Sequence, residues 1–318
     1  FIDVTDATRE PIKQYFYIRI WSAPCALLLY AFKGWFIGMQ NSKFPMIIAI
    51  ITNILNIVFS LLFVYSFKFS FKGVALGTVV AEYSGLLLAL ILWFTYYGKL
   101  KKYINWAEIF VKEKLLQFFK INSNIFLRTF CLILVFTSFT TFSTKSGDTI
   151  LAVNTLLLQL FTLFSYIMDG FAYAAESLTG KYIGAKNNFQ LRISIKYIFR
   201  WGWILTILFT ILYYFWGDQI LSLLTNNQSV LEASKPYYKW VLLIPISGFG
   251  AFLWDGVYVG ATASKAMRNA IFIATFGYFI LYFLLEPVLG NNALWMALLL
   301  FLLLRGIGMK LMARKYIY

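Results

Sequence analysis

The sequence KGWFIGMQNSK, residues 33–43, returns 222 residues later as DGVYVGATASK, residues 255–265. The two stretches share a glycine at the second position, a glycine at the sixth and a final Ser-Lys pair. Each ends a long apolar segment that starts with adjacent aromatic residues, and two more apolar segments follow each. Such a repeat is typical of membrane proteins built from two related halves.

The repeat also predicts how the chain is divided. At this spacing residues 107–236 have no counterpart upstream, because the chain begins too late. We therefore expect a complete C-terminal lobe over 121–318 and an N-terminal lobe over 1–97 that lacks about three helices. The intact protein would then have twelve membrane-spanning helices in two pseudo-symmetric lobes of six.

Composition places the chain in the membrane. Hydrophobic residues make up 61% of it and charged residues 13%, about half the charge of a soluble domain. Apolar runs of this length cross a bilayer as helices, because an unpaired backbone is too costly in lipid. The sequence therefore predicts an all-α integral membrane protein, a polytopic helical bundle of nine spans: 14–38, 44–67, 73–97, 121–143, 149–179, 197–217, 237–260, 269–288 and 292–313.

The loops predict the orientation. Lysine and arginine are concentrated in the connections 98–120 and 180–200 and in the C-terminal tail, all on one side of the predicted bundle. By the positive-inside rule that side is cytoplasmic, so the C-terminus is expected inside. The net charge of +15 is therefore mostly a topology signal. It does not form the clustered soluble face that nucleic acid requires, and no nucleic-acid partner is expected.

The 98–120 connection has two interpretations. Ile104, Ala107, Val111, Leu115 and Phe118 fall roughly on one helical face with lysines around it. This pattern predicts an amphipathic linker helix lying on the inner membrane surface between the lobes. A plain charged linker accounts for the same residues equally well.

The sequence contains few of the residue patterns that an enzyme would need. The chain has no histidine, which removes Ser-His hydrolysis and HExxH zinc sites. Cys25 and Cys131 lie alone in different spans, without metal-binding spacing. No Gly-rich phosphate loop is present either. We therefore expect neither an enzyme nor a bound cofactor or metal.

Charged residues inside the spans carry the functional information, because each costs about 2.5–3.5 kcal/mol to insert. Asp169, Tyr173 and Glu176 follow one another at i, i+4 and i+7, so they share one face of a helix rich in small residues. Two carboxylates there could hold a proton, a sodium ion or a cationic substrate. They could equally be salt-bridge partners, with Arg128 as the obvious mate. Glu82, Glu286 and Arg305 are expected to reach an interface and to be structural.

The repeat relates two further charges, and a pair of amides lies in a separate span. Lys33 and Asp255 are equivalent in the two copies and opposite in sign, so they could form an inter-lobe pair that breaks when one side opens. Asn53 and Asn56 lie mid-span at i, i+3. They are expected to join helices by hydrogen bonds or to line a cavity of the N-terminal lobe.

At this point the sequence resembles a known family. WFIGMQN (35–41) and NILNIVF (53–59) are similar to segments of the multidrug and toxic compound extrusion (MATE) transporters. DGFAYAAE (169–176), with the residues around Asn122–Thr129 and Gly184, is similar to the DNA-damage-inducible (DinF-type) branch. The resemblance covers nearly the whole chain. It implies helices 4 to 12 of a twelve-helix, two-lobe antiporter.

The resemblance implies a secondary active efflux antiporter that exports cationic or amphipathic organic compounds by alternating access, driven by proton or sodium entry. Its implied partners are small organic molecules and the lipid bilayer, and its implied state is a monomer in the bacterial inner membrane. The family's first helix, with its ion-coupling aspartate, would precede Phe1, and Ser60 stands where many members have another aspartate. Both departures count against proton coupling through the N-terminal lobe.

Three alternatives remain open. A lipid-linked oligosaccharide flippase of the related superfamily would have a strongly cationic cavity, whereas the charges inside the spans here are balanced. A membrane scaffold without transport would not need charges buried in both lobes. A membrane enzyme is disfavoured by the missing histidines.

Overall fold

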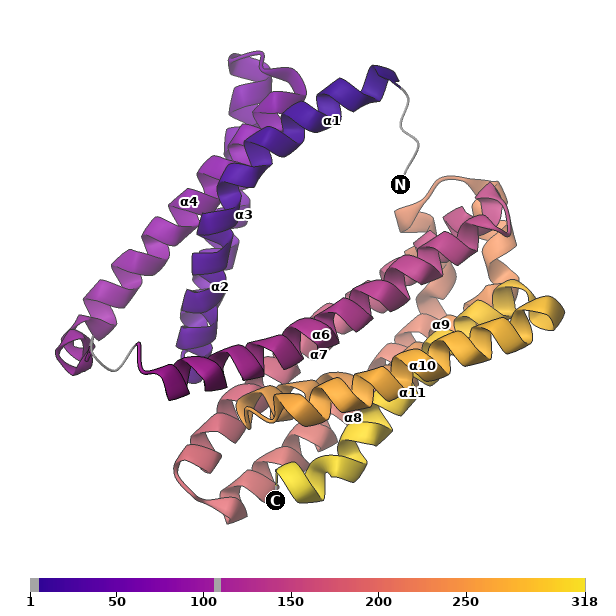
Figure 1. The fold of residues 1–318 in the computed structure, drawn as a ribbon. Coiled ribbons are helices and arrows are strands. Elements are labelled where there is room, and N and C mark those ends of the chain that lie inside the picture. The colour runs from indigo at the N-terminus through magenta and orange to yellow at the C-terminus, as the bar shows by residue number, and fades with distance from the viewer. Residues whose placement is uncertain (1–5, 106–109, 318) are drawn as a thin grey trace. The chain divides into compact units, whose positions relative to one another are not determined.

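The computed structural model describes residues 6–105 and 110–317. It divides the chain into two compact units, Phe1–Glu108 and Ile109–Tyr318, called here the first and second units (Figure 1). Within the described residues nine helical segments, with Glu10–Gly38 counted as one, are long and apolar enough to cross a membrane, and no strand occurs. The prediction of an all-α membrane protein with nine spans is confirmed.

The first unit is built around α4, which contacts the three other helices of the unit. Its buried face consists of small residues, among them Gly77, Ala81 and Gly85. A methyl group on Gly77 would meet the backbone nitrogen of Ser60 at 2.6 Å, so α3 and α4 touch backbone to backbone. The helices of this unit are α1 (Asp6–Arg19), α2 (Ala23–Gly38), α3 (Lys43–Leu61) and α4 (Ser70–Tyr97).

The first predicted span, 14–38, is not one helix. A 3₁₀ turn at Ile20–Ser22 separates α1 from α2. Pro24 explains the break, because proline has no N–H to donate and its ring collides with the carbonyl four residues earlier. The Ser22 hydroxyl donates to the carbonyl oxygen of Arg19 over 2.8 Å. The break leaves Arg19 at the end of α1, where it meets Glu82 of α4.

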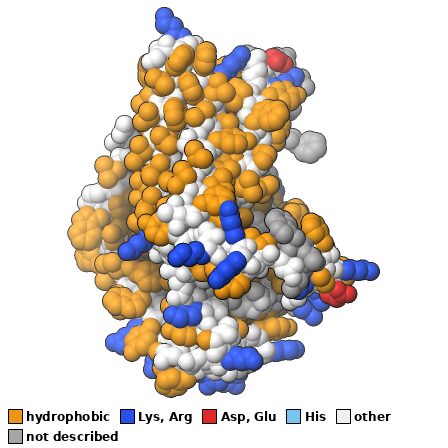
Figure 2. Space-filling view, turned by 90° about the vertical axis from the view of Figure 1, so that its left-hand side faces the viewer, with side chains coloured by type: hydrophobic (Ala, Val, Ile, Leu, Met, Phe, Trp, Pro, Cys, Tyr) orange, Lys and Arg blue, Asp and Glu red, His pale blue; other side chains and the backbone are white. Residues whose placement is uncertain are grey.

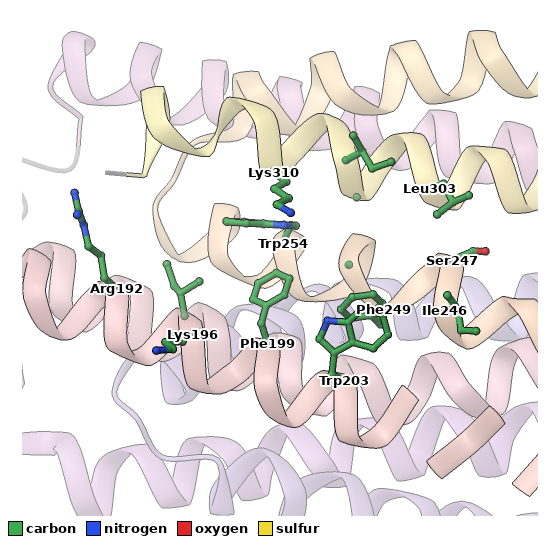
Figure 3. Close-up of a pocket in the computed structure, with 14 residues that line it drawn as sticks. Arg192, Lys196, Phe199, Trp203, Ile246, Ser247, Phe249, Trp254, Leu303 and Lys310 are labelled. Carbon is green, nitrogen blue, oxygen red and sulfur yellow. The ribbon is translucent and has the colours of Figure 1, made fainter. Parts of the chain in front are cut away.

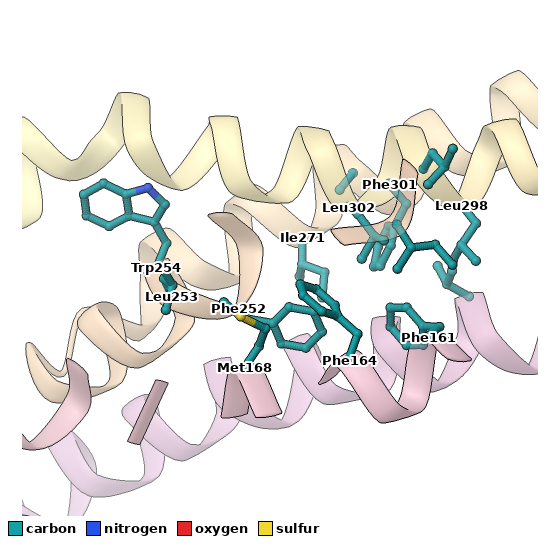
Figure 4. Packing of buried hydrophobic residues seen from close by; sticks show 14 of the residues in the cluster. Phe161, Phe164, Met168, Phe252, Leu253, Trp254, Ile271, Leu298, Phe301 and Leu302 are labelled. Atoms are coloured by element: carbon teal, nitrogen blue, oxygen red, sulfur yellow. The ribbon is translucent and has the colours of Figure 1, made fainter. Parts of the chain in front are cut away.

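The second unit has α9 at its centre. This helix contacts α7, α8, α10 and α11, and every residue from Ala251 to Tyr258 is buried. Figure 4 shows Phe164 and Met168 of α7 packed with Phe252 of α9. The helices of this unit are α6 (Lys112–Thr144), α7 (Asp148–Gly184), α8 (Asn188–Leu224), α9 (Gln228–Gly260), α10 (Ser264–Leu289) and α11 (Asn291–Tyr316).

The segment 98–120 differs from the single amphipathic helix that its pattern predicts. Gly98–Tyr103 is a 3₁₀ helix, Ile104 is extended, and Ala107 lies outside the described residues. From Lys112 onward the segment is already α6. Extending a helix by one residue is much easier than nucleating a new one, so the apolar span that follows draws the lysine-rich stretch into its own first turns.

Helices α7 and α8 have 37 residues each, or about 56 Å at 1.5 Å per residue, and therefore extend past a hydrocarbon core of about 30 Å. Their surfaces suit lipid: on α8 the side chains of Ile207, Leu208 and Tyr214 are more than half exposed. Figure 2, which faces the side of Figure 1 where α4 is labelled, shows a broad field of exposed hydrophobic side chains with few charges in the upper part of the view. Exposed apolar helices of this kind require a bilayer around them.

The two copies of the repeat form the same turn. After α2, the amide of Gln40 donates to Ile37 and that of Asn41 to Phe36; after α9, the amide of Thr262 donates to Val259 and that of Ala263 to Tyr258. Each of these pairs is related by the same 222-residue shift. Gln40 and Thr262 both take a left-handed conformation, with φ of 58° and 54°. This is the Schellman helix ending, and it extends the sequence repeat to the backbone.

Candidate functional site

The charged cluster of the second unit is centred on Asp255 of α9. Its carboxylate accepts hydrogen bonds from Arg128 of α6 and Arg305 of α11. Asp255 is 8% exposed and Arg305 4%. A single charge this deep in a membrane-spanning bundle would be costly, whereas a carboxylate between two guanidinium groups is stabilised by both. The cluster therefore ties α6, α9 and α11 together at one point.

The backbone beside Asp255 lies against α7. A methyl group on Gly256 would collide with the carbonyl oxygen of Ala172, and one on Gly260 with that of Glu176. Only glycine permits this approach, which is why the glycines of the repeat are needed here. The contact brings the middle part of α7, which carries Asp169, close to Asp255.

Asp169 is the fourth member of this group, which we call the Asp255 cluster: Arg128, Asp169, Asp255 and Arg305. Asp169 is partly buried, and the charges of the other three members act on it. Two carboxylates and two guanidinium groups make the cluster formally neutral. The Nε atoms of both arginines are buried without a hydrogen-bond partner among the described residues, so they can still donate.

The other two residues predicted on the α7 face lie further along the helix. Tyr173 is 53% exposed and Glu176 is partly buried, with its backbone against Gly260. The helix is unbroken, so the three residues do follow one another at successive turns. Of the three, Asp169 is the one on which the charges of the cluster act.

Two interpretations of the arginines need correction. Arg128 was the suggested mate of Asp169 and Glu176 under the salt-bridge interpretation, whereas the ion pair that it forms is with Asp255. Arg305 was expected to reach an interface, but it is buried. Gly306 explains the second result: a methyl group there would meet the backbone nitrogen of Ala251 at 3.0 Å, so this part of α11 lies against α9. Small residues beside a charged one were the signal that could have identified Arg305.

The first unit holds a separate polar group. Arg19 donates to Glu82 over 3.0 Å, and Glu82 forms part of the wall of a cavity of about 190 Å³. Lys33, Asn53 and Thr52 also line this cavity, whereas Asn56 does not. One Glu82 oxygen and the Thr52 hydroxyl are buried with no partner in the described residues. The structure thus brings Lys33 and Asn53 together, and it adds Glu82, which was expected to be structural.

The proposed pairing of Lys33 with Asp255 stays a prediction, because the two residues belong to different units. Within its own unit Asp255 already binds two arginines. The Lys33 ammonium lies 5.6 Å from the centre of the Tyr30 ring. In the described part of the chain no group of three or more His, Cys, Asp or Glu side chains is placed to hold a metal ion.

Comparison with known proteins gives a consistent result. Residues 1–62 and 125–288 match the model of the family named MatE. The DNA damage-inducible protein F of Escherichia coli (strain K12) is 34% identical over 316 residues, which are 98% of this chain and 68% of that protein. Protein DETOXIFICATION 44, chloroplastic, of Arabidopsis thaliana is 24% identical over 93% of this chain and 56% of its own length.

Solved structures show the same fold. A crystal structure of the Vibrio cholerae MATE transporter VcmN in the bent form has a TM-score of 0.85, with 16% sequence identity, over 99% of this chain and 71% of that one. An outward-facing multidrug resistance MATE family transporter of the MOP superfamily has a TM-score of 0.74 over 96% and 69%. This chain therefore spans roughly two thirds of these proteins or less.

Proposed function

This chain belongs to the MatE family, whose members are transporters and not enzymes, and we propose that it acts as a secondary active antiporter. Family membership makes it a multi-pass membrane protein of the multidrug and toxin efflux class. The proposal goes further: export of cationic or amphipathic organic compounds by alternating access, coupled to the entry of protons or sodium ions. The protein would act as a monomer in a bacterial inner membrane, with its C-terminus in the cytoplasm.

The observation that carries this proposal is the Asp255 cluster. It places two acids and two bases, formally neutral together, within membrane-spanning helices of one unit. One added proton or cation would leave a net positive charge in a place where an unpaired charge is expensive. The arrangement that best suits the loaded cluster therefore differs from the one that suits the empty cluster. That difference is what coupling an ion to a conformational change requires.

The Asp255 cluster also lets a proton and a cationic substrate compete for the same carboxylate. A cationic substrate near Asp169 would compete with Arg128 and Arg305 for carboxylate oxygen, and a proton on Asp169 would remove the site for that substrate. Exchange of a proton for an organic cation follows from this competition. The cavity at Lys33, Asn53 and Glu82 supplies polar groups in the first unit that a substrate could contact.

The test is ethidium efflux from drug-sensitive cells that express the protein together with any coding sequence that precedes Phe1. We expect Asp169→Asn to abolish efflux at unchanged protein level, and Asp169→Glu to restore part of it. Asp218→Asn is the matched control, because Asp218 is an exposed aspartate in the same unit. An uncoupler should stop wild-type efflux if protons drive it, and removal of sodium should stop it otherwise.

Normal efflux from Asp169→Asn would remove the carboxylate from the mechanism. Absence of efflux from well-folded wild-type protein would instead favour the flippase alternative, whose substrates ethidium does not resemble.

A further inference from the structure

A groove of about 390 Å³ lies on the second unit between α8, α9 and α11 (Figure 3). Its charged lining residues are Arg192, Lys196 and Lys310, and among the residues that the structure describes no acidic side chain lines it. All three basic side chains lie toward the Trp254 end of the groove. Ile246 and Leu303 lie toward the opposite end. The groove is therefore basic at one end and apolar at the other.

The walls between the two ends are aromatic. The ring of Phe199 lies 5.0 Å from that of Trp254, and the ring of Trp203 lies 4.4 Å from that of Phe249. Phe199 and Phe249 join the two pairs at 6.3 Å. Gly250 and Gly306, where α9 and α11 approach each other, also line the groove. A continuous apolar track thus leads away from the basic end.

The order of residues along the helices fixes the direction of this track. On α8 the lining runs from Arg192 to Trp203, eleven residues or about 16 Å along the helix. That length is close to half of a hydrocarbon core of about 30 Å, which is one leaflet. The basic end belongs to the start of α8 and the end of α11, near the Lys-rich connection and tail that the positive-inside rule assigns to the cytoplasm.

We propose that this groove binds one acidic phospholipid of the cytoplasmic leaflet. The phosphate of the headgroup lies among Arg192, Lys196 and Lys310, and one acyl chain follows the aromatic track. Basic pockets between membrane helices on the cytoplasmic side suit anionic headgroups. The inference does not depend on the transport proposal, because the Asp255 cluster supplies none of the groove's residues.

Other occupants fit less well. An organic cation would meet three like charges and no acid among the described lining residues. A soluble phosphate compound would satisfy the basic end, but it would leave the aromatic track empty. A zwitterionic phospholipid would fill the track, but its own positive charge would face the three basic side chains.

The experiment is native mass spectrometry of the purified protein in detergent with added phosphatidylglycerol, phosphatidylcholine or glycerol phosphate. We expect the protein to retain phosphatidylglycerol in preference to the other two probes. Lys196→Gln with Lys310→Gln should weaken that binding by about fivefold for each lysine removed. Arg314→Gln with Lys315→Gln is the matched control, because both residues are exposed at the end of α11 and outside the groove.

A second variant separates the track from the charges. Trp203 is 46% exposed, so Trp203→Ala should fold normally, and it should weaken phosphatidylglycerol while leaving any glycerol phosphate binding unchanged. Equal retention of phosphatidylglycerol and phosphatidylcholine would overturn the proposal. So would equal loss in the Lys196/Lys310 variant and its control. Glycerol phosphate that binds as well as the lipid would show an anion site without a lipid.

Discussion

The turn after α2 and the turn after α9 have the same backbone hydrogen bonds but very different surroundings. At the second turn Gly256 and Gly260 lie against the backbone of α7, and the residue before them, Asp255, is buried between two arginines. At the first turn a methyl group on Gly34 or Gly38 would meet no described atom within 4 Å. The repeat therefore preserves a local structure whose glycines, within the described residues of each unit, are used for packing in the second copy and not in the first.

The turn therefore forms without contacts from neighbouring helices. A Schellman ending needs only a left-handed residue and the last carbonyls of its own helix. Close helix packing and charge burial need partner helices, and α6, α7 and α11 supply them in the second unit. In the first unit the described partners are fewer.

Substitution of the charged residue that begins each copy, Lys33 or Asp255, should give the largest difference in stability between the two units. Asp255→Asn leaves Arg128 and Arg305 buried with no carboxylate between them, and breaking a buried pair in this way costs about 3–5 kcal/mol. Lys33→Met at the equivalent position should have little effect. Each unit has one buried free cysteine, Cys25 in the first and Cys131 in the second. The rate of thiol labelling on heating, in single-cysteine variants, therefore reports the stability of each unit separately.

The control for this comparison is the double variant Asp255→Asn with Arg128→Met, which removes one of the stranded charges and should recover part of the loss. If Asp255→Asn changed Cys131 labelling no more than Lys33→Met changed Cys25 labelling, the two charges would be equivalent in environment and the contrast between the copies would be wrong.

Replacing a glycine by alanine should change stability in opposite directions in the two copies. Gly260→Ala forces α9 away from the Glu176 carbonyl, and overpacking of this kind costs about 1–3 kcal/mol. Gly38→Ala meets nothing and exchanges the poorest ordinary helix former for the best, so it should stabilise the first unit by up to about 1 kcal/mol. The same labelling measures both. A loss of stability in Gly38→Ala would reveal a partner against α2 outside the described contacts.

The ion pair of the first unit should be weaker than the Asp255 cluster. Glu82 has one partner, Arg19, and both side chains retain some exposure, 19% and 29%. Glu82→Gln should therefore cost about 1 kcal/mol, measured by Cys25 labelling, since water can reach the arginine that remains. The charge-preserving Glu82→Asp is the control. A loss as large as that of Asp255→Asn would mean that Arg19 is sealed from solvent.

Much of this architecture could be predicted from sequence. Apolar runs identified the nine spans, and the repeat identified the matching turns. Charged residues inside spans pointed to Arg128, Asp169 and Asp255, but not to which of them pair. Pairing depends on helix rotation and contact, which one-dimensional periodicity does not contain. Arg305 and Glu82 were missed for a related reason: hydropathy gives the depth of a residue along its own helix, and burial depends on the neighbours.

The left-handed residue of the two turns gives the smallest effect. Gln40 and Thr262 have φ near +55°, a conformation that costs an L-residue about 1–2 kcal/mol relative to glycine. Glycine also increases the conformational entropy of the unfolded chain, which offsets about 0.4–1 kcal/mol of this stabilisation. A net stabilisation of about 0.5–1 kcal/mol remains for Thr262→Gly, and less is expected for Gln40→Gly, because a β-branched side chain is the more strained of the two.

Thiol labelling of Cys131 measures the Thr262 variant and that of Cys25 the Gln40 variant. Thr262→Ala is the control, because alanine keeps the strain and should bring no comparable gain. A third turn, after α7, adds a check within the second unit: Lys186 has φ of 52° and the same pair of hydrogen bonds, from Lys186 to Ile183 and from Asn187 to Tyr182. If Lys186→Gly stabilised the unit and Thr262→Gly did not, the Thr262 side chain would be making contacts that offset its strained backbone.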